Sequence, residues 1–255
     1  VMAFIQYAMQ IIMSFLMICM ISVMLPRAAV SAERVDEVLK SETKIHDPKE
    51  PKTLPKNGKG EVAFEHVSFH YPGAEEDVLH DITFTAKPGE TTAFIGSTGC
   101  GKSTLVNLIP RFYDVTEGKI TIDGQDVRDL TQHELREKLG YVPQKGVLFS
   151  GTIGSNIMFG NPDGNEQDME EAAKIAQATE FIDTKSKKYD STISQGGGNV
   201  SGGQKQRLSI ARAIAKHPKL FIFDDSFSAL DYKTDVALRA ALKENTQDST
   251  VIIVA

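Results

Sequence analysis

The sequence predicts an α/β domain with a largely parallel core sheet, preceded by one membrane-spanning helix. Residues 1–25 are apolar and carry no charged side chain. From Glu61 onward, short apolar runs typical of strands alternate with longer amphipathic segments typical of helices. A glycine-rich segment at residues 96–103 lies between one of these strands and the next helix. The length of 255 residues allows one or two domains with a substantial core.

The apolar segment at the start of the chain is long enough to cross a bilayer as a helix, which needs about 20 residues. Charge begins at Arg27, and basic residues continue to Lys44. Because positive residues mark the cytoplasmic flank of a spanning helix, we expect the chain to leave the membrane on that side. A signal peptide, with a basic start and a shorter apolar core, and a buried soluble helix are the alternatives. The chain begins without Met inside the apolar run, which favours the last helix of a truncated membrane domain.

Composition divides the chain into three parts. Residues 1–45 comprise the transmembrane helix and its cytoplasmic extension, residues 46–60 form a linker rich in Pro, Lys and Gly, and residues 61–255 form the α/β domain. We expect strands at residues 61–71, 82–86, 91–95, 119–124, 141–144, 219–225 and 249–255. We expect helices at residues 103–113, 131–140, 165–179, 201–217 and 231–245. Thr131 and Glu134 match a capping box, and Ser201 is a candidate N-cap.

The glycine-rich segment GSTGCGKS matches the phosphate-binding pattern G-x-x-x-x-G-K-[ST]. Glycines let the backbone curl so that N–H groups point at phosphate oxygens, and the following helix N-terminus adds partial positive charge. Lys102 is expected to reach the outer phosphates, and the Ser103 hydroxyl to ligate Mg²⁺. A plain glycine-rich turn is the alternative. The candidate nucleotide-binding residues of this segment are Gly96, Ser97, Thr98, Gly99, Cys100, Gly101, Lys102, Ser103 and Thr104.

Other features bound the chemistry. The apolar strand LFIFDD ends in Asp224, which is placed to hold Mg²⁺ through water, although many buried strands end in Asp. Cys19 and Cys100 have no metal-ligand spacing and predict no disulfide. The net charge of −6 argues against a protein that binds nucleic acid.

Four further motifs accompany the phosphate-binding pattern: HYPG at residues 70–73, YVPQ at 141–144, VSGGQ at 200–204 and SALD at 228–231. With them the chain resembles the nucleotide-binding domain of an ABC transporter from Glu61 to its last residue. The resemblance implies the phosphate-loop NTPase fold, with a mixed core sheet and a helical subdomain. Residues 1–45 resemble, less specifically, the last membrane helix of an exporter-type half-transporter.

The resemblance implies a role for each motif. Tyr71 would stack on adenine, and Gln144 would sense Mg²⁺ and the attacking water. Asp231 would belong to the D-loop. Taken alone, Tyr71 is also consistent with a surface aromatic near a turn. Gln144 and Asp231 are also consistent with solvated polar residues. The signature residues would hold the nucleotide of a second domain, paired head to tail; they are Ser201, Gly202, Gly203 and Gln204. The implied Mg²⁺ ligands are Ser103, Gln144 and Asp224.

The chain departs from the family pattern at the position after Asp224. There the family usually has Glu, which orients or deprotonates the attacking water, and this chain has Asp225. Its side chain is one methylene shorter, and a misplacement of about an ångström can cost ~10²-fold in rate. Asp at this place resembles the weak site of heterodimeric bacterial exporters. Gln195 also stands where exporters usually carry Glu, and the switch histidine would come after Ala255.

The resemblance implies an ATPase with ATP and Mg²⁺ as cofactors and with Asp225 and Gln144 as catalytic residues. We expect a subunit of an exporter of amphiphilic compounds, drugs or lipids, in the cell membrane as a multi-pass protein with its nucleotide domain in the cytoplasm. Its partners would be the lipid bilayer and a second, different half-transporter whose competent site the intact SGGQ completes. The first alternative is a homodimer in which Asp225 is a slow base. The second alternative is an ABC protein of DNA repair or translation, and the spanning helix argues against it. The third is a purely regulatory subunit, and the intact SGGQ argues against that.

Overall fold

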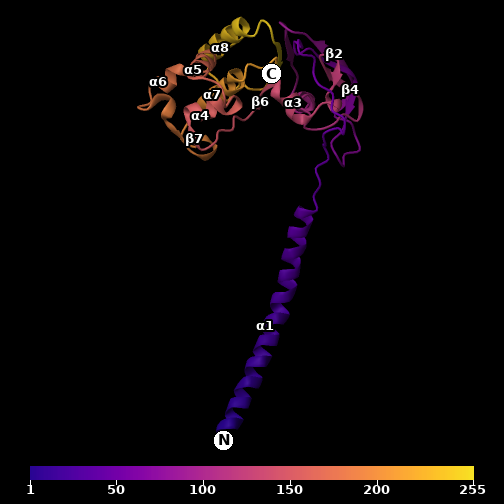
Figure 1. Cartoon of the computed structure of the whole chain (residues 1–255), viewed down its shortest axis with the longest axis vertical. Coiled ribbons are helices and arrows are strands. Elements are labelled where there is room, and N and C mark those ends of the chain that lie inside the picture. The colour runs from indigo at the N-terminus through magenta and orange to yellow at the C-terminus, as the bar shows by residue number, and fades with distance from the viewer. The chain divides into compact units, whose positions relative to one another are not determined.

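The apolar N-terminal segment forms one long helix, α1 (Met2–Leu39), in the computed structural model, which describes all 255 residues (Figure 1). The helix contains no glycine and buries none of its side chains, and it continues through Pro26. Ser14 and Ser22 donate hydrogen bonds to carbonyl oxygens four residues earlier, so their hydroxyls are satisfied within the helix. By length and composition, α1 is the one helix that could cross a membrane.

The chain divides into two compact units, Val1–His46 and Asp47–Ala255, and all strands lie in the second. One sheet is antiparallel, in the order β2 (Leu79–Ala86), β1 (Val62–Phe69), β4 (Glu117–Ile122), β5 (Gln125–Asp126). The other is parallel, in the order β3 (Thr91–Phe94), β10 (Thr250–Val254), β9 (Leu220–Asp224), β6 (Leu139–Val142). Two short strands, β7 (Gly151–Thr152) and β8 (Thr192–Ile193), pair separately. The predicted parallel core sheet is thus confirmed.

Seven helices complete this second unit. They are α2 (Lys102–Leu108), α3 (Gln132–Glu137), α4 (Ile153–Ile157), α5 (Glu166–Ile175), α6 (Thr179–Asp183), α7 (Gly202–Ala215) and α8 (Tyr232–Asn245). Short 3₁₀ turns lie at Val127–Asp129, Met158–Gly160, Lys188–Asp190 and Gln195–Gly197. Helices α4 to α7 gather on one side of the unit and β2, β4 and α3 on the other (Figure 1).

The parallel sheet separates two apolar cores. Every residue of β9 and β10 is buried, as expected for strands covered on both faces. Alternate residues point to opposite faces, so Phe221 and Phe223 join the core of the helical side. Leu220 and Ile222 join the core beneath the antiparallel sheet and α2. The result is an α/β fold with one parallel sheet, one antiparallel sheet and a helical subdomain, in agreement with the fold that the resemblance implies.

The register of the parallel sheet decides where a site can form. Val254 of β10 pairs with both Phe94 of β3 and Asp224 of β9, and Val142 of β6 pairs with Phe223. The carboxyl ends of these strands therefore meet at one edge. Ligands of open parallel sheets bind at this edge.

The caps of the helices agree only partly with the sequence predictions. Ser201 caps α7 and forms a reciprocal capping box with Gln204. Thr131 caps α3, but the predicted capping box is wrong, because the Glu134 side chain accepts a hydrogen bond from the Leu54 amide at 2.8 Å instead. The α3 helix also ends before Gly140, at Glu137, because β6 begins at Leu139.

Residues 47–60 lie along the surface of the second unit and are held by several hydrogen bonds. The Lys52 side chain and amide both bond Asp129, each at 2.8 Å. The Asp123 carboxylate accepts from the amides of Lys59, Gly60 and Glu61. The Leu54 side chain packs against the core beneath the antiparallel sheet. Residues 47–60 are therefore hydrogen-bonded to the rest of the domain near both of their ends.

Candidate functional site

The loop between β3 and α2 has the backbone that the glycine-rich pattern predicts. Gly99 and Gly101 have φ values of 86° and 91°, in the left-handed region that glycine adopts without strain. Gly101 is also the N-cap of α2, and a Cβ placed there would lie 3.1 Å from Leu79 Cδ2 and 3.3 Å from the Val78 carbonyl oxygen. Residues 96–100 are exposed. The loop therefore presents free backbone at the amino end of a helix, which suits phosphate.

Lys102 lies across this loop. Its ammonium donates to the carbonyl oxygens of Gly96 at 2.6 Å and Ser97 at 3.0 Å. The Cys100 sulfur is 4.0 Å away, and both cysteines of the chain are free. An ammonium held over a loop of exposed amides supplies the charge that β- and γ-phosphate oxygens require.

Ser103 and Asp224 meet beneath the loop. The Ser103 hydroxyl donates to Asp224 Oδ1 at 2.8 Å, although 121 residues separate them. Burial raises the pKa of Asp224, as does the nearby charge of Asp225, while the Ser103 hydrogen bond and Lys102 lower it. One hydroxyl and one carboxylate are the hard oxygen ligands that Mg²⁺ takes beside nucleotide phosphates. This donor set fits Mg²⁺, which would neutralise developing phosphate charge when bound.

Gln144 and Asp225 also meet at the carboxyl ends of the strands. The Gln144 amide donates to Asp225 Oδ2 at 2.9 Å. Asp225 has a left-handed φ of 45°, and its N–H donates to the Val254 carbonyl oxygen at 3.1 Å. A left-handed Asp carries some backbone strain, which is typical of functional turns. The half-buried carboxylate thus lies beside the Asp224 site, in contact with the glutamine that the sequence assigns to the same chemistry.

Tyr71 lies at the edge of the loop. Its ring packs edge-on against Phe69, at a centroid distance of 5.0 Å, and against Tyr113, at 5.2 Å. Its hydroxyl hydrogen-bonds the Thr104 hydroxyl at 2.8 Å. The tyrosine is only partly buried, and the hydrogen bond fixes it beside the first turn of α2. An aromatic held this way can present a face to a purine ring.

The signature residues lie on a different element. Ser201 caps α7: its hydroxyl accepts from the Gln204 amide at 3.3 Å, and Gln204 Oε1 accepts from the Ser201 amide at 3.1 Å. A Cβ on Gly203 would lie 3.1 Å from the Ala229 carbonyl oxygen, so the signature helix packs closely on residues 228–231. No hydrogen bond joins this helix end to the phosphate loop. Gly202 and Gly203 therefore form a second, separate helix N-terminus that could receive phosphate.

Asp231 has a local role in this geometry. Its carboxylate caps α8 by accepting from the Thr234 amide at 3.0 Å and the Thr234 hydroxyl at 2.7 Å. These hydrogen bonds lower the pKa of Asp231. The side chain is exposed beside the signature helix, where it is accessible to another molecule.

The site contains contacts that sequence reasoning missed. Tyr141 donates from its hydroxyl to Asn107 Oδ1 at 2.8 Å and so joins β6 to α2; burial first, and then the charge of Asp224, raise the pKa of Tyr141 to about 12. The fully buried Ser226 donates to the Val142 carbonyl oxygen at 2.9 Å and so joins the turn after β9 to β6. No local sequence pattern predicts these contacts, because the bonded residues lie 34 and 84 positions apart in the chain.

Comparison with known proteins agrees with this geometry. The family model described as "ABC transporter" matches residues 79–228, more than half of the chain. The chain belongs to the ABC transporter family. This membership establishes an ATP-binding domain of the ABC ATPase type, and the match contains both the phosphate loop and the signature helix of this ABC chain.

Individual relatives are consistent with the family. An uncharacterized ABC transporter ATP-binding protein of Mycobacterium tuberculosis is 47% identical over 99% of this chain and 44% of its own length. A Staphylococcus aureus relative, provisionally named a multidrug export ATP-binding/permease protein, is 45% identical over 77% of this chain and 34% of its own length. The solved structure of a bacterial Atm1-family ABC exporter with ATP bound matches with a TM-score of 0.82 and 34% identity, over 90% of this chain and 40% of that one. The ABC chain thus spans less than half the length of these relatives.

Proposed function

We propose that this chain is the ATP-binding and membrane-spanning part of an ABC exporter subunit, which couples ATP binding and hydrolysis to export of amphiphilic compounds such as drugs or lipids. The phosphate loop and the Ser103–Asp224 pair supply a site for Mg²⁺-ATP. Helix α1 supplies one span, and the relatives named for export support the direction of transport. The subunit would be a multi-pass protein of the cell membrane, with the nucleotide domain in the cytoplasm.

The observation that carries the finer proposal is the combination of Asp225 with an intact signature helix. We infer that the subunit pairs head to tail with a second, different half-transporter. In that dimer this chain's phosphate loop, with Lys102, Ser103 and Asp224, would hold ATP for long periods. The residues from Ser201 to Gln204 would complete the competent site on the partner's loop.

The short reach of Asp225 would make this site a weak one. Asp225 is one methylene shorter than Glu, and its carboxylate accepts the Gln144 amide at 2.9 Å. The shorter side chain, held by this hydrogen bond, would extend less far toward a water that attacks the γ-phosphate than Glu would. General-base catalysis needs hydrogen-bond reach to the proton, so this geometry favours nucleotide retention over turnover.

One observation favours the second candidate, a homodimer with Asp225 as a slow base. Asp225 keeps its charge and lies next to Gln144, so the two groups that would manage the attacking water are already together. In a homodimer both sites would have this composition, and all turnover would depend on Asp225.

ATP turnover by the assembled transporter carrying Asp225→Asn separates the two candidates. For the heterodimer we expect turnover within about twofold of wild type, because the chemistry takes place on the partner's loop. A loss of about 10²-fold or more, the usual scale for a general base, would instead make Asp225 the working base. The matched control is Asp225→Glu, which should raise turnover if reach is what limits this site.

A further inference from the structure

The carboxyl end of α2, opposite the phosphate loop, has an uncommon termination. The Phe112 amide donates to the Asn107 carbonyl oxygen and the Arg111 amide to the Leu108 carbonyl oxygen, the bonding pattern of a Schellman motif. The residue in the left-handed position is Arg111, with a φ of 54°, where glycine is usual. A residue other than glycine is strained in this conformation, so other contacts are needed to stabilise it.

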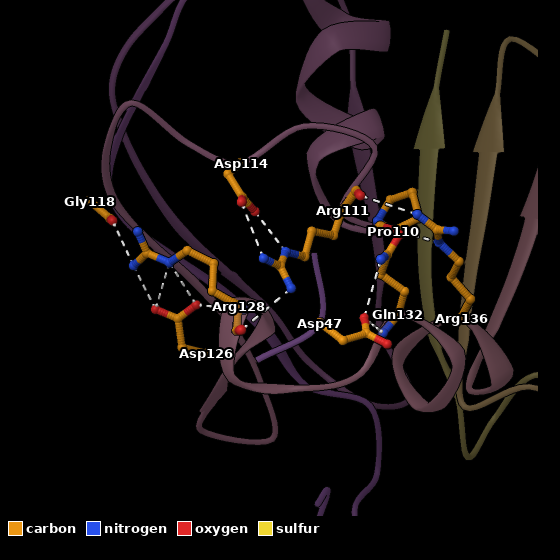
Figure 2. A network of polar contacts seen from close by, with 9 residues as sticks. All are labelled: Asp47, Pro110, Arg111, Asp114, Gly118, Asp126, Arg128, Gln132 and Arg136. Atoms are coloured by element: carbon orange, nitrogen blue, oxygen red, sulfur yellow. Dashed lines mark hydrogen bonds and ion pairs between the residues drawn. The ribbon is translucent and has the colours of Figure 1, made fainter. Parts of the chain in front are cut away.

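Arg136 of α3 caps this end of α2. Its Nε donates to the Pro110 carbonyl oxygen at 3.0 Å and its Nη2 to the Arg111 carbonyl oxygen at 3.2 Å (Figure 2). Its guanidinium also lies over the Phe112 ring, 5.4 Å from the centroid. Carbonyls at the end of a helix lack intrahelical partners, and a cation there opposes the helix dipole favourably. One side chain from another element therefore fixes the end of the phosphate-loop helix.

The Arg111 side chain completes the arrangement. It is 6% exposed and makes a two-point ion pair with Asp114, with N–O distances of 2.7 and 3.2 Å. Its Nη1 also donates to the Arg128 carbonyl oxygen at 3.4 Å (Figure 2). We call Arg111, Asp114 and Arg136 the α2 clamp. The clamp is built from buried or half-buried charge-assisted hydrogen bonds, which are the strong ones.

The α2 clamp is next to Asp47, the first residue of the nucleotide-binding unit. The Asp47 carboxylate accepts from the Gln132 amide at 2.9 Å and from the Gln132 side chain at 3.2 Å, at the first turn of α3 (Figure 2). These hydrogen bonds, followed by the charges of Arg111 and Arg136, lower the pKa of Asp47. The same short helix α3 therefore contacts Asp47 at one end and caps α2 with Arg136 at the other.

We propose that Arg136 is a positioning residue of the nucleotide site, and that through α3 and Asp47 it couples nucleotide occupancy of the phosphate loop to the order of residues 47–54. Helix α2 has only seven residues, so it is a short link between the loop at its amino end and the turn at its carboxyl end that the clamp holds. A phosphate that orders the amino end restrains the clamp, and the clamp restrains α3. Residues 47–54 are then held more firmly through Asp47 and through the Glu134–Leu54 hydrogen bond.

Thermodynamic linkage makes the coupling reciprocal. If bound nucleotide orders residues 47–54, then ordering of these residues must strengthen nucleotide binding by the same factor. Residues 47–54 directly follow the stretch of chain that connects to α1, so such a coupling would act where the membrane helix is attached. The inference rests only on nucleotide binding by the loop, which labelling of the wild-type protein tests separately.

The test uses the assembled transporter, photolabelled with an azido-ATP so that label on this subunit is resolved from label on its partner. In Arg136→Gln we expect half-maximal labelling to need roughly three- to tenfold more nucleotide, with full labelling at saturation. Arg136→Lys, which keeps the charge and one donor, should lose less. Hydrogen exchange of residues 47–54 should slow when ATP is added to the wild type, and this effect should disappear in Arg136→Gln.

Arg128→Gln is the matched control. Arg128 makes a two-point ion pair with Asp126 and donates to the Gly118 carbonyl oxygen, but its side chain does not contact α2. Equal labelling curves for Arg136→Gln and Arg128→Gln would overturn the positioning role, as would an ATP effect on exchange that survives in Arg136→Gln. If Arg136→Gln fails to fold, Asp47→Ala replaces it: the coupling requires weaker labelling in this variant too, and unchanged labelling would overturn it.

Discussion

At the scale of one residue, Asp224 lowers the stability of the fold because its charge is buried, and the same burial suits it to bind a cation. The residue is 4% exposed, and the charge of the neighbouring Asp225 acts on its carboxylate. One hydroxyl hydrogen bond and the more distant Lys102 offset this only in part, so its pKa stands above the usual value. A buried charge without a full set of partners is costly. Such a group is primed to accept a divalent cation, which would remove the penalty.

The raised pKa gives a prediction about Asp224→Asn. A folded-state pKa above the unfolded value of about 3.8 means that stability is lost as pH rises through the interval between the two, and stays lost at neutral pH. Without nucleotide, Asp224→Asn should therefore melt at a higher temperature than the wild type at pH 7. The difference should shrink toward pH 4. Thermal unfolding across this range checks it, and a variant less stable than wild type at pH 7 would contradict the argument. Stabilisation by Mg²⁺-ATP should be lost in the variant.

The contacts of single residues also show what could not be predicted from sequence. Lys102, Ser103 and Asp224 belong to patterns in which spacing and flanking strand or helix define the chemistry, and the structure places Ser103 and Asp224 within hydrogen-bond distance. The Arg136–Pro110 hydrogen bond carries no such signal. It joins a side chain to a backbone carbonyl oxygen 26 residues away, and only tertiary packing brings them together.

At the scale of elements, local rules predicted the strands and long helices well and the short pieces badly. Apolar runs in the sequence predicted β9 and β10, and Ser201 predicted the start of α7. Helices α4 and α6 have five residues each, too few for a periodic pattern, and were not predicted. The predicted box at Thr131 failed because a distant amide, that of Leu54, competes for the Glu134 carboxylate. Tertiary contacts overrode a sound local signal.

The junction of the phosphate loop with α2 gives a prediction about Gly101→Ala. Gly101 has a φ of 91°, and a Cβ would crowd Leu79 and Val78 at 3.1–3.3 Å. The left-handed backbone costs an L-residue about 1–2 kcal/mol, and the crowding adds to this. Gly73→Ala is the control, because Gly73 has a φ of 89° with nothing within 4 Å of the added methyl. In urea unfolding, Gly101→Ala should lose more stability than Gly73→Ala, and it alone should weaken azido-ATP labelling. Equal losses in both measurements would show that the backbone, not the packing at the loop, sets the cost.

At the scale of the whole molecule, the phosphate loop and the signature helix are two separate helix N-termini that no hydrogen bond joins. In the proposed head-to-tail dimer, each would be half of a nucleotide site, and a second molecule would supply the missing halves. The two halves would then serve different nucleotides. If the partner is a different chain with a competent site, damage to the two halves must have unequal consequences.

This asymmetry gives a prediction about Lys102→Ala and Ser201→Ala. Lys102→Ala removes phosphate binding from the retaining site and should leave most of the assembled transporter's ATP turnover. Ser201→Ala removes a donor from the partner's competent site, and it should lower turnover by roughly tenfold or more. Loss of the Ser201 cap also costs about 1 kcal/mol of stability, so Asn165→Ala, which removes an equivalent capping box from α5, is the control and should leave turnover near normal. In a homodimer both substitutions damage both sites. Equal and nearly complete losses of ATP turnover would therefore contradict the asymmetric dimer and favour a symmetric one that depends on Asp225.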